Sequence, residues 1–578
     1  MESGLYGDAA VDGDDVDRSR PGGASAPPAG LGEGGSDAVA PHADQSTQKR
    51  PSWMRGVVLG LLATAAGLAV AELVVGLIQG SSSPVVPVGQ EFIDVAPGWL
   101  QDWAKETFGT DQKTVLVAGA VIVVFVLGTL IGVLAVRGER GFAYGLTVAI
   151  GVIGVWAVWL RPDPDLGKML PTIAGTTVSL GVLRWLSPRT GPPDADDPAG
   201  RPITMGPDRR QFIQGAVGIG SVAAVAGGIG RLLQQNNEVD TDFALPGAEG
   251  ADVGTATAGD LAPGTTVPID RAGPLPVDVE LGVDGIESFV VPNDNFYRID
   301  TALTVPQLPR ESWRLSIDGL VDRPIELNYD ELVSMPMVER YITLSCVSNP
   351  VGGELVGNAL WQGVLLTDVL DMAGVQPEAE QLVSRSVDGW TCGTPVEAVT
   401  DGRDAMLAIG MNGEPLPAQH GFPVRMVVPG LFGYVSATKW VTDMRLTRWD
   451  EFDAYWVPRG WAKEGPVKTM ARIDTPRSGR SVEGVVPIGG VAWAVHRGVG
   501  AVQVRVDGGE WRDAEMGSVP SADTWVQWVY RWDTSEVTEG RHSIEVRALD
   551  GDGVPQPEEP KAVAPDGAQG YHRAVLHV

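Results

Sequence analysis

The stretch 341-YITLSCVSNP-350 decides how the central part of this chain folds. An apolar, β-branched run of this kind predicts a strand, and the Asn, Pro and Gly residues after it predict a turn. The run therefore carries one thiol, that of Cys346, to the end of a strand, where a soft ligand can reach a metal cofactor. Free cysteines are also common as small buried hydrophobic residues, and in an exported domain Cys346 could form a disulfide with Cys392. On the cysteine alone, these two interpretations are favoured.

The composition excludes several classes of function. The 578 residues are enough for several domains, and the formal net charge is −30. Such an acidic chain is not expected to bind nucleic acid, which needs clustered Lys and Arg. With only two cysteines, the chain cannot form a four-thiolate zinc or iron–sulfur site. The six histidines form neither a Cys-x-x-Cys-His haem attachment site nor a His-Glu-x-x-His metalloprotease signature.

The N-terminal part of the chain predicts a tail followed by a membrane region. Residues 1–50 contain almost no large apolar groups, which predicts a disordered acidic tail. Residues 51–235 then hold five apolar stretches that approach or exceed the length needed to cross a bilayer. We predict five transmembrane helices, forming an all-α bundle, at Gly56–Leu77, Val115–Val136, Gly141–Leu160, Leu166–Leu186 and Phe212–Leu233.

The distribution of basic residues predicts the orientation in the membrane. Lys and Arg gather before the first stretch, between the second and third, and around the connection from the fourth to the fifth. By the positive-inside rule these three regions are cytoplasmic. We therefore predict a multi-pass protein of the cell membrane with a cytoplasmic N-terminus. Everything after residue 235 is then expected to be extracytoplasmic.

The last span begins with a second signal, Asp208-Arg-Arg-Gln-Phe-Ile213. This resembles a twin-arginine export signal, which directs folded domains across a membrane. The alternative is ordinary positive-inside charge in front of a helix. The Phe-Ile pair and the weakly hydrophobic run after it favour the export signal, which would remain as an uncleaved anchor because no Ala-x-Ala site closely follows.

Residues 236–285 are rich in Gly, Ala, Pro, Thr and Asp and predict a flexible linker, and a domain is expected over residues 286–462. That domain opens with 292-PNDNFYR-298, in which Asn-Asp-Asn alone would indicate a turn. Later, Arg425 lies on an apolar strand and Lys439 follows a glycine-containing turn. A guanidinium and an ammonium in such places suit a buried anion. The alternative for Arg425 is an internal salt bridge.

The segments 292–298, 341–350 and 420–440, in this order, resemble motifs of the sulfite oxidase family of molybdopterin enzymes. The resemblance implies an α+β domain with a Mo-molybdopterin cofactor. Cys346 would be the only protein ligand of the metal, and a catalytic residue. It also implies a turn near the substrate pocket at residues 388–391. The resemblance further implies that the cofactor is contacted by Asn293, Phe296, Tyr297, His420, Arg425, Ser436 and Lys439.

Two departures from the family pattern bear on the substrate. The residues after Cys346, Val347–Gly353, include no cation, although sulfite-oxidising members carry an Arg there. Arg298 is followed by Ile-Asp-Thr, without the His that those members have a few positions later. Because a dianion needs paired cations in a desolvated site, these differences argue against sulfite.

Residues 463–578 predict an all-β domain. Alternating strands are separated by turns such as Asp507-Gly-Gly-Glu510 and Asp550-Gly-Asp-Gly553, a spacing that favours a sandwich. The region resembles the immunoglobulin-like dimerisation domain of the same family, which implies a homodimer. The Trp-rich strand within 524-TWVQWVYRW-532 is expected to lie in the core.

Together these observations predict a membrane-anchored extracytoplasmic molybdopterin oxidoreductase. It would transfer an oxo group to or from a small substrate, such as a sulfur or nitrogen oxide, or an oxidised protein side chain such as methionine sulfoxide. Electrons would pass to or from a separate carrier, because the sequence shows no haem, flavin or iron–sulfur motif. The alternative is a non-enzymatic, membrane-tethered binding protein that keeps the fold without metal, which a Cys346–Cys392 disulfide would favour.

Overall fold

The computed structural model describes residues 53–78, 81–97, 100, 103, 104, 107, 108, 112–161, 164–187, 189–193, 202–205, 209–236, 238–247 and 268–578. These residues belong to one compact unit, Pro51–Val578. The tail predicted over residues 1–50 lies outside the described residues.

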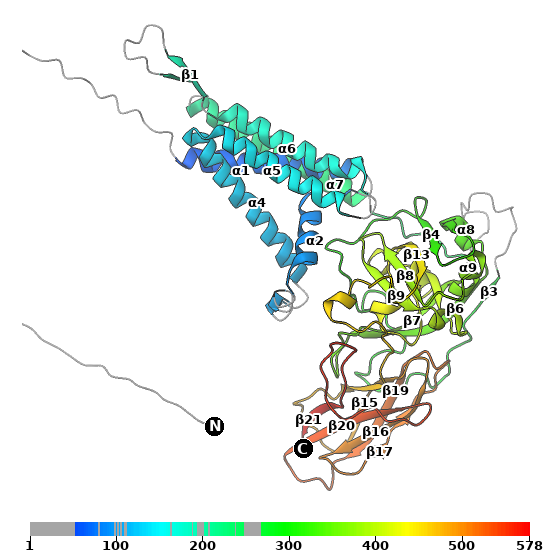
Figure 1. Ribbon diagram of the computed structural model, residues 1–578. Coiled ribbons are helices and arrows are strands. Elements are labelled where there is room, and N and C mark those ends of the chain that lie inside the picture. Colours follow the sequence, from blue (N-terminus) through cyan, green and yellow to red (C-terminus); the bar gives the residue numbers. More distant parts are fainter. Residues whose placement is uncertain are drawn as a thin grey trace, which may run out of the picture. The chain divides into compact units, whose positions relative to one another are not determined.

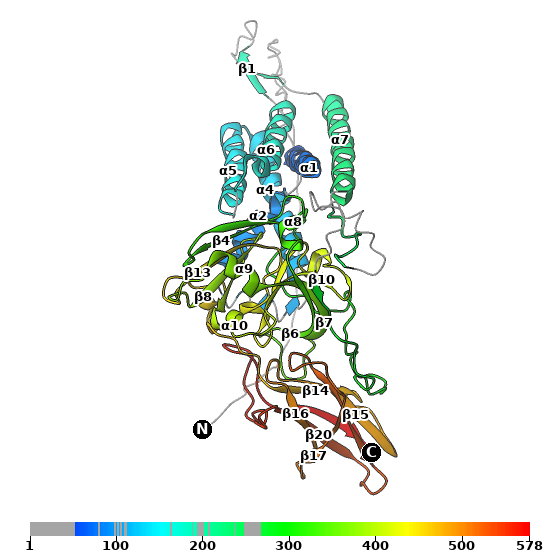
Figure 2. The ribbon, with the colours of Figure 1, turned by 90° about the vertical axis from the view of Figure 1, so that its right-hand side faces the viewer.

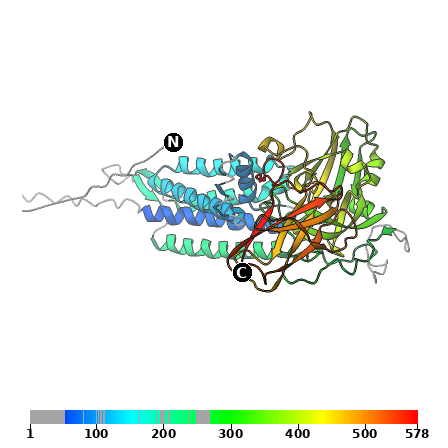
Figure 3. The same ribbon diagram turned by 90° about the horizontal axis from the view of Figure 1, so that it is seen from below.

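Among the residues that the structure describes, five helices are long and apolar enough to cross a membrane, which confirms the five predicted stretches. They are α1 (Trp53–Leu77), α4 (Gln112–Arg137), α5 (Arg140–Trp159), α6 (Leu166–Leu186) and α7 (Arg209–Asn236). The helices lie side by side, and α1 packs against α4, α6 and α7 (Figure 1, Figure 3). Between α1 and α4 the chain forms a short helix, α2 (Val85–Val95), and between α6 and α7 a strand pair, β1 (Arg189–Pro193) and β2 (Pro202–Met205).

Glycines allow α1 and α4 to approach closely. A Cβ atom added to Gly60 would lie 2.1 Å from the carbonyl oxygen of Gly128, and one added to Gly132 would lie 2.2 Å from that of Gly56. Small residues at such crossings let two backbones touch where lipid offers no hydrophobic drive for association. Any larger side chain at these positions would push the two helices apart.

Two sheets form the domain that holds the predicted motifs, together with the short helices α8 (Tyr329–Val333), α9 (Leu366–Ala373) and α10 (Glu397–Thr400). The first sheet has the order β11-β10-β7-β6-β3, with β12 also paired to β10; the second has the order β5-β4-β13-β8-β9. The strands of the first are β3 (Ile269–Asp270), β6 (Met337–Ser345), β7 (Val356–Leu365), β10 (Met406–Met411), β11 (Glu414–Pro415) and β12 (Arg425–Val427). Those of the second are β4 (Arg314–Gly319), β5 (Ile325–Asn328), β8 (Gln381–Ser386), β9 (Thr391–Pro395) and β13 (Val441–Thr447).

The first sheet runs through the hydrophobic core. All six residues of β10 are buried, which explains why this strand reads as a continuous apolar run rather than an alternating one. Strand β6 pairs antiparallel with β7 along its length, from Val338 opposite Gly363 to Ser345 opposite Val356. The residue after Ser345 is Cys346, so the predicted strand end is where the thiol lies.

Part of the segment predicted as a flexible linker is built into the domain. Ile269 and Asp270 form β3 and pair parallel with β6, and Leu245 is buried in the core. The amide of Gln362 donates to the carbonyl of Pro246 at 2.9 Å. The linker interpretation of residues 236–285 is therefore too broad for these described residues, because their apolar side chains find a place in the core that their composition did not reveal.

The C-terminal part contains two antiparallel four-stranded sheets, with orders β14-β15-β19-β18 and β17-β16-β20-β21 (Figure 2). The strands are β14 (Met470–Thr475), β15 (Val485–Trp493), β16 (Val499–Val506), β17 (Arg512–Asp513), β18 (Glu515–Met516), β19 (Val526–Asp533), β20 (Arg541–Asp550) and β21 (His572–His577). Trp525 and Trp528 are fully buried and Trp532 is 5% exposed, which confirms the core position of the Trp-rich strand. The immunoglobulin-like classification stays a prediction.

Candidate active site

Cys346 follows β6 directly and begins a tight turn. Its amide donates to the carbonyl of Leu355 at 2.9 Å, and its carbonyl accepts from the amide of Asn349 at 3.0 Å. The thiol is free and 9% exposed, and burial raises its pKa, although hydrogen bonds from Ser348 act against that rise. Cys392 is also free and is fully buried, so the disulfide interpretation is wrong in this structure.

An aromatic group surrounds Phe296. Its ring stacks on Tyr297 with centroids 5.2 Å apart, and its edge contacts are with Trp361 and His420, both at 5.8 Å. Nε2 of His420 lies 2.9 Å from the carbonyl oxygen of Asn293. Burial, followed by the nearby Arg425, lowers the pKa of His420 to about 4. The imidazole is therefore neutral near pH 7, which agrees with a structural hydrogen bond rather than with a cation.

Arg425 is a buried cation whose hydrogen bonds are incomplete. Its guanidinium lies over the Trp361 ring, 4.8 Å from the centroid, and Nη1 donates to the carbonyl of His420 at 3.0 Å. The Nε atom is buried and has no hydrogen-bond partner in the described part of the chain. Burial lowers the pKa of Arg425 to about 10, and Tyr297 opposes this. A buried guanidinium with an orphaned donor is costly unless an anion completes it, so the site fits a group that brings one.

Lys439 forms an ion pair with Asp300, which is not among the predicted site residues. Its ammonium donates to Asp300 Oδ2 at 2.8 Å and to the carbonyl of Gln419 at 3.1 Å. Burial lowers the pKa of Lys439 to about 8, while the carboxylate of Asp300 works in the opposite direction. The internal salt bridge that was the alternative for Arg425 is not found among the described residues, and it is Lys439 that forms a buried ion pair.

Asp300 forms ion pairs with three basic side chains. Its carboxylate is 4% exposed, and besides Lys439 it binds Lys113 at 2.6 Å and Arg298 at 2.9 Å. Burial acts to raise its pKa, but the neighbouring lysines, Lys439 first, hold that pKa well below its usual range. The sequence indicates this ion-pairing role of Asp300 only weakly, through the position of the acid shortly after Phe296 and Tyr297 in a turn-rich segment.

We expect Asp300→Asn to destabilise the full chain by about 3 to 5 kcal/mol, because removing one member of a buried ion pair leaves the others uncompensated. The unfolded carboxyl titrates near 3.8 and the folded one titrates lower, so ionised Asp300 stabilises the fold fully above that pH. The contribution falls as the pH drops below it. Denaturant unfolding in detergent between about pH 6 and about pH 3 measures this, and the difference between wild type and variant should shrink in acid.

The matched control is Asp294→Asn, an exposed carboxylate six residues earlier, for which we expect a change within about 0.5 kcal/mol. A difference for Asp300→Asn that stays constant across the pH range would contradict the assigned ion-pair role.

The side chains of Asn293 and Ser436 are engaged by the protein itself. Asn293 Oδ1 accepts from Asn412 at 2.8 Å, and its Nδ2 donates to the carbonyl of Met411 at 3.3 Å. Ser436 Oγ donates to the carbonyls of its own loop, at Leu431 and Phe432, both at 3.0 Å. Asn293 therefore contacts the group through its backbone carbonyl, while the side chain of Ser436 stabilises the loop over residues 431–436.

A pocket of about 380 Å³ adjoins this group of residues. One side is formed by Thr301, Asp388, Trp390 and Tyr455, so the turn at residues 388–391 borders this pocket. Thr301 Oγ1 lies 3.5 Å from Asp388 Oδ2, and the amide of Trp390 donates to Asp388 Oδ1 at 3.1 Å. Burial raises the pKa of Asp388. Tyr455 was missed because it lies more than a hundred residues from Cys346 in a segment without a distinctive motif.

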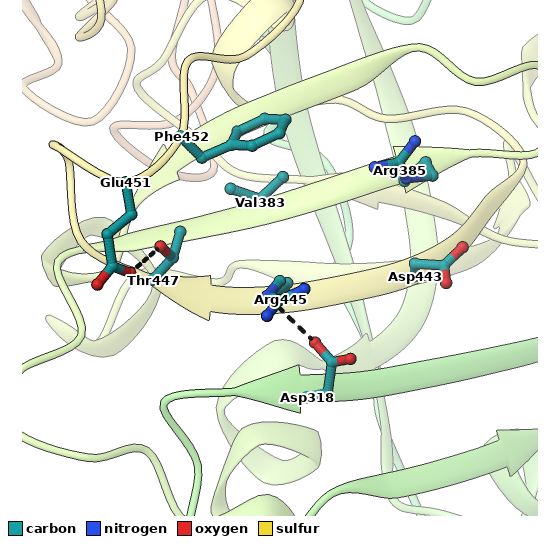
Figure 4. A pocket seen from close by; sticks show the side chains of 8 residues that line it. All are labelled: Asp318, Val383, Arg385, Asp443, Arg445, Thr447, Glu451 and Phe452. Atoms are coloured by element: carbon teal, nitrogen blue, oxygen red, sulfur yellow. Dashed lines mark hydrogen bonds and ion pairs between the residues drawn. The ribbon is translucent and has the colours of Figure 1, made fainter. Parts of the chain in front are cut away.

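A second hollow, of about 550 Å³, lies on the outer face of the second sheet (Figure 4). It is lined by Asp443 and Arg445 of β13, whose neighbours Met444 and Leu446 point into the core. Arg445 faces Asp318 at 3.8 Å. No predicted site residue lines this hollow, although Arg385 borders both it and the pocket of about 380 Å³.

Within the described residues, no three His, Cys, Asp or Glu side chains gather into a metal site. A metal held here would therefore rely on the single thiol of Cys346 and on ligands that the cofactor itself brings. The free thiol, the orphaned guanidinium and the aromatic group all fit such a cofactor.

The chain matches the model of the oxidoreductase molybdopterin binding domain over residues 302–456. It is 32% identical over 180 residues to the uncharacterized oxidoreductase YuiH of Bacillus subtilis. The aligned stretch covers 30% of this chain and 87% of YuiH. It is 30% identical to the sulfite oxidase of Gallus gallus (48% of this chain, 70% of the relative) and 31% identical to the mitochondrial sulfite oxidase of Homo sapiens (40% and 50%). A solved structure, the sulfane dehydrogenase SoxCD of Paracoccus pantotrophus, aligns with a TM-score of 0.43 and 23% identity, covering 51% of this chain and 84% of that one.

The chain thus spans about half the length of the human enzyme. Of the predicted site residues, Cys346, His420, Arg425, Ser436 and Lys439 lie within the matched domain, whereas Asn293, Phe296 and Tyr297 precede it.

Proposed function

This chain belongs to the sulfite oxidase family of molybdopterin-dependent oxidoreductases, and on this premise we propose that it is a membrane-anchored enzyme that performs oxo transfer outside the cytoplasm. It is an oxidoreductase, and its cofactor is Mo-molybdopterin. When bound, this cofactor supplies the two-electron redox change and the oxo group. The observation that carries the cofactor part of the proposal is the buried guanidinium of Arg425, whose Nε has no partner among the described residues. Arg425 and the free thiol of Cys346 belong to one group of residues, since both influence the pKa of Tyr297.

Each residue of the group has a proposed role. Cys346 ligates the metal, and Phe296 and Tyr297 present aromatic surface to the pterin, together with the backbone at Asn293. Arg425 and Lys439 bind its phosphate, Arg425 as a fork and Lys439 as a point charge. His420 orients Arg425 through its carbonyl, and Ser436 holds the adjoining loop. The protein thereby orients the cofactor and excludes water from its charged end.

The proposed substrate is a small sulfur or nitrogen oxide rather than sulfite. No cation stands in Val347–Gly353, where a dianion would need one. Electrons would be exchanged with a separate carrier, since the sequence carries no haem, flavin or iron–sulfur motif. We propose domains at residues 51–235, 286–462 and 463–578, the last an immunoglobulin-like sandwich through which two copies associate.

Molybdenum content tests the proposed function. We expect near-stoichiometric molybdenum by elemental mass spectrometry of the purified full chain, together with turnover of a sulfoxide or N-oxide with a reduced dye. Absence of molybdenum from a host that makes the cofactor and exports the domain would favour the binding-protein alternative.

Localisation makes a separate prediction. Because a twin-arginine route requires both arginines, we expect Arg209→Lys together with Arg210→Lys to leave the spans inserted while the domain stays inside. Protease added to intact spheroplasts should then spare the domain, although the charge is unchanged. Replacing Arg137 by Lys is the matched control and should leave the domain accessible. Normal accessibility in the double variant would refute the twin-arginine assignment.

A further inference from the structure

The segment that carries Cys346 is bonded on both sides to the C-terminal part of the chain. Before the cysteine, the amide of Thr343 in β6 donates to the carbonyl of Asp523 at 2.9 Å, and its hydroxyl accepts from the amide of Trp525 at 2.8 Å. Thr343 is 1% exposed and Trp525 is fully buried, so these hydrogen bonds are shielded from water. The end of β6 is thus joined to the residues that lead into β19.

The turn after the cysteine is closed by its own backbone and by Asn349. The amide of Asn349 donates to the carbonyl of Cys346, and Oδ1 of Asn349 accepts from the amide of Leu355 at 3.0 Å. The carbonyl of Leu355 in turn accepts from the amide of Cys346 at 2.9 Å. Residues 346–355 therefore form a closed loop, the ligand loop, and a movement of its far side is expected to shift the thiol.

Arg472 of β14 bonds the far side of the ligand loop. Its Nη1 donates to the carbonyl of Gly353 at 3.1 Å, and its Nε donates to Asp474 Oδ1 at 2.5 Å. Nη2 lies 3.9 Å from the carboxylate of Glu287, and the side chain of Arg472 is 6% exposed. Because two carboxylates already balance this buried cation, it acts on the loop as a hydrogen-bond donor and not as a charge for an anionic substrate.

His572 of β21 fills the space beside Gly352. A Cβ atom added to Gly352 would lie 2.4 Å from Nε2 of His572, and the φ of Gly352 is +76°, which favours glycine. Nδ1 of His572 accepts from the amide of Ile473 at 2.9 Å, next to Arg472. Burial lowers the pKa of His572, so the ring is neutral near pH 7 and carries its proton on Nε2. His572 thus bonds β14 with one nitrogen and packs on the ligand loop with its ring.

We propose that Arg472 and His572 are positioning residues of the active site, which fix the ligand loop and with it the thiol that ligates the metal. This inference rests on the proposed function and deepens it, since the C-terminal part then takes part in the reaction and does more than join two copies. Both residues lie outside residues 302–456, so the match to the molybdopterin binding domain does not assign them. They act on Cys346 through the two glycines of its loop.

Alkylation of Cys346 tests the role of His572, in full chain made without cofactor so that no metal shields the thiol. Cys392→Ser leaves Cys346 as the only thiol, and its 9% exposure is expected to make alkylation of this parent chain slow. We expect His572→Leu to accelerate alkylation by iodoacetamide by about tenfold or more under native conditions, because losing a supporting hydrogen bond favours local opening of the loop. His572→Asn should return the rate to near that of the parent chain, since its Oδ1 can accept from the amide of Ile473 as Nδ1 does.

His542→Leu is the matched control for His572→Leu. His542 also lies in the C-terminal part, is 7% exposed and bonds through both ring nitrogens, to Asp507 at 2.7 Å and to the carbonyl of Thr538 at 2.8 Å, neither of which belongs to the ligand loop. We expect His542→Leu to lower the free energy of unfolding at least as much as His572→Leu, while alkylation stays at the rate of the parent chain. Equal acceleration in both variants, or none in His572→Leu, would overturn the positioning role of His572.

Arg472→Lys tests the other contact without removing the charge. Lysine keeps a cation beside Asp474, but its ammonium lacks the fork with which one guanidinium bonds both that carboxylate and the carbonyl of Gly353. We expect alkylation of Cys346 to accelerate by about fivefold or more. Arg505→Lys, the same change at an arginine that bonds two glutamates of the C-terminal part, should leave the rate unchanged. A parent-like rate in Arg472→Lys would overturn the role of Arg472. Alkylation requires neither turnover nor molybdenum, so its failure is distinguishable from a failure of the proposed oxidoreductase function.

Discussion

Cys346→Ser is expected to lower turnover by about three orders of magnitude or more while the domain remains folded. Serine is close in size to cysteine, but its hydroxyl is a harder and more basic ligand than a thiol, so a soft metal site loses its one protein ligand. In the described part of the chain no other set of side chains could substitute for it. Turnover and molybdenum content, measured on the same preparation, provide the test.

Cys392→Ser is the matched control. This cysteine is also free and is fully buried, and its sulfur lies 3.7 Å from Thr394 Oγ1. We expect a stability cost of about 1 kcal/mol and near-normal turnover, because the side chain only fills the core. Wild-type-like turnover in Cys346→Ser, or an equal loss in both variants, would contradict the assignment of Cys346 as the metal ligand.

Arg425→Met is expected to have opposite effects on cofactor binding and on stability. Losing a charged, forked donor should reduce retention of the cofactor by about tenfold or more. The cofactor-free protein should instead become more stable by about 1 to 3 kcal/mol, since an incompletely paired buried cation is replaced by an apolar side chain of similar length. Molybdenum content measures the first effect, and denaturant unfolding of protein made without cofactor measures the second.

The control for Arg425→Met is Arg445→Met, since the side chain of Arg445 is 69% exposed and lies 3.8 Å from the carboxylate of Asp318. It should change neither quantity appreciably. If Arg425→Met retains its cofactor, or destabilises the cofactor-free protein, then the guanidinium is a structural cation and the anion-binding role proposed for it is wrong.

Features that depend on local composition were predictable from the sequence. The five apolar helices follow from the length of uninterrupted apolar residues, and the strand before Cys346 follows from a β-branched run that ends in a turn. The buried Trp-rich strand follows in the same way. The motif residues Phe296, Tyr297, His420 and Arg425 were predicted from the sequence, and the structure brings them together around Phe296 and Trp361.

What the sequence determined by itself is thus the set of membrane-length helices, the strand that ends at the thiol, and the motif residues around it. The tertiary structure alone decided how the charges pair. Asp300 binds Lys439 and Lys113, which are 139 and 187 positions away, and Tyr455 binds Asp94 across 361 positions. It also decided that the hydroxyl of Ser436 donates to a carbonyl of its own loop, and that Ile269 and Asp270 pair with β6. The physical reason is that hydrophobic periodicity is recorded in neighbouring residues, whereas an ion pair depends on which distant segments the fold brings within hydrogen-bond distance.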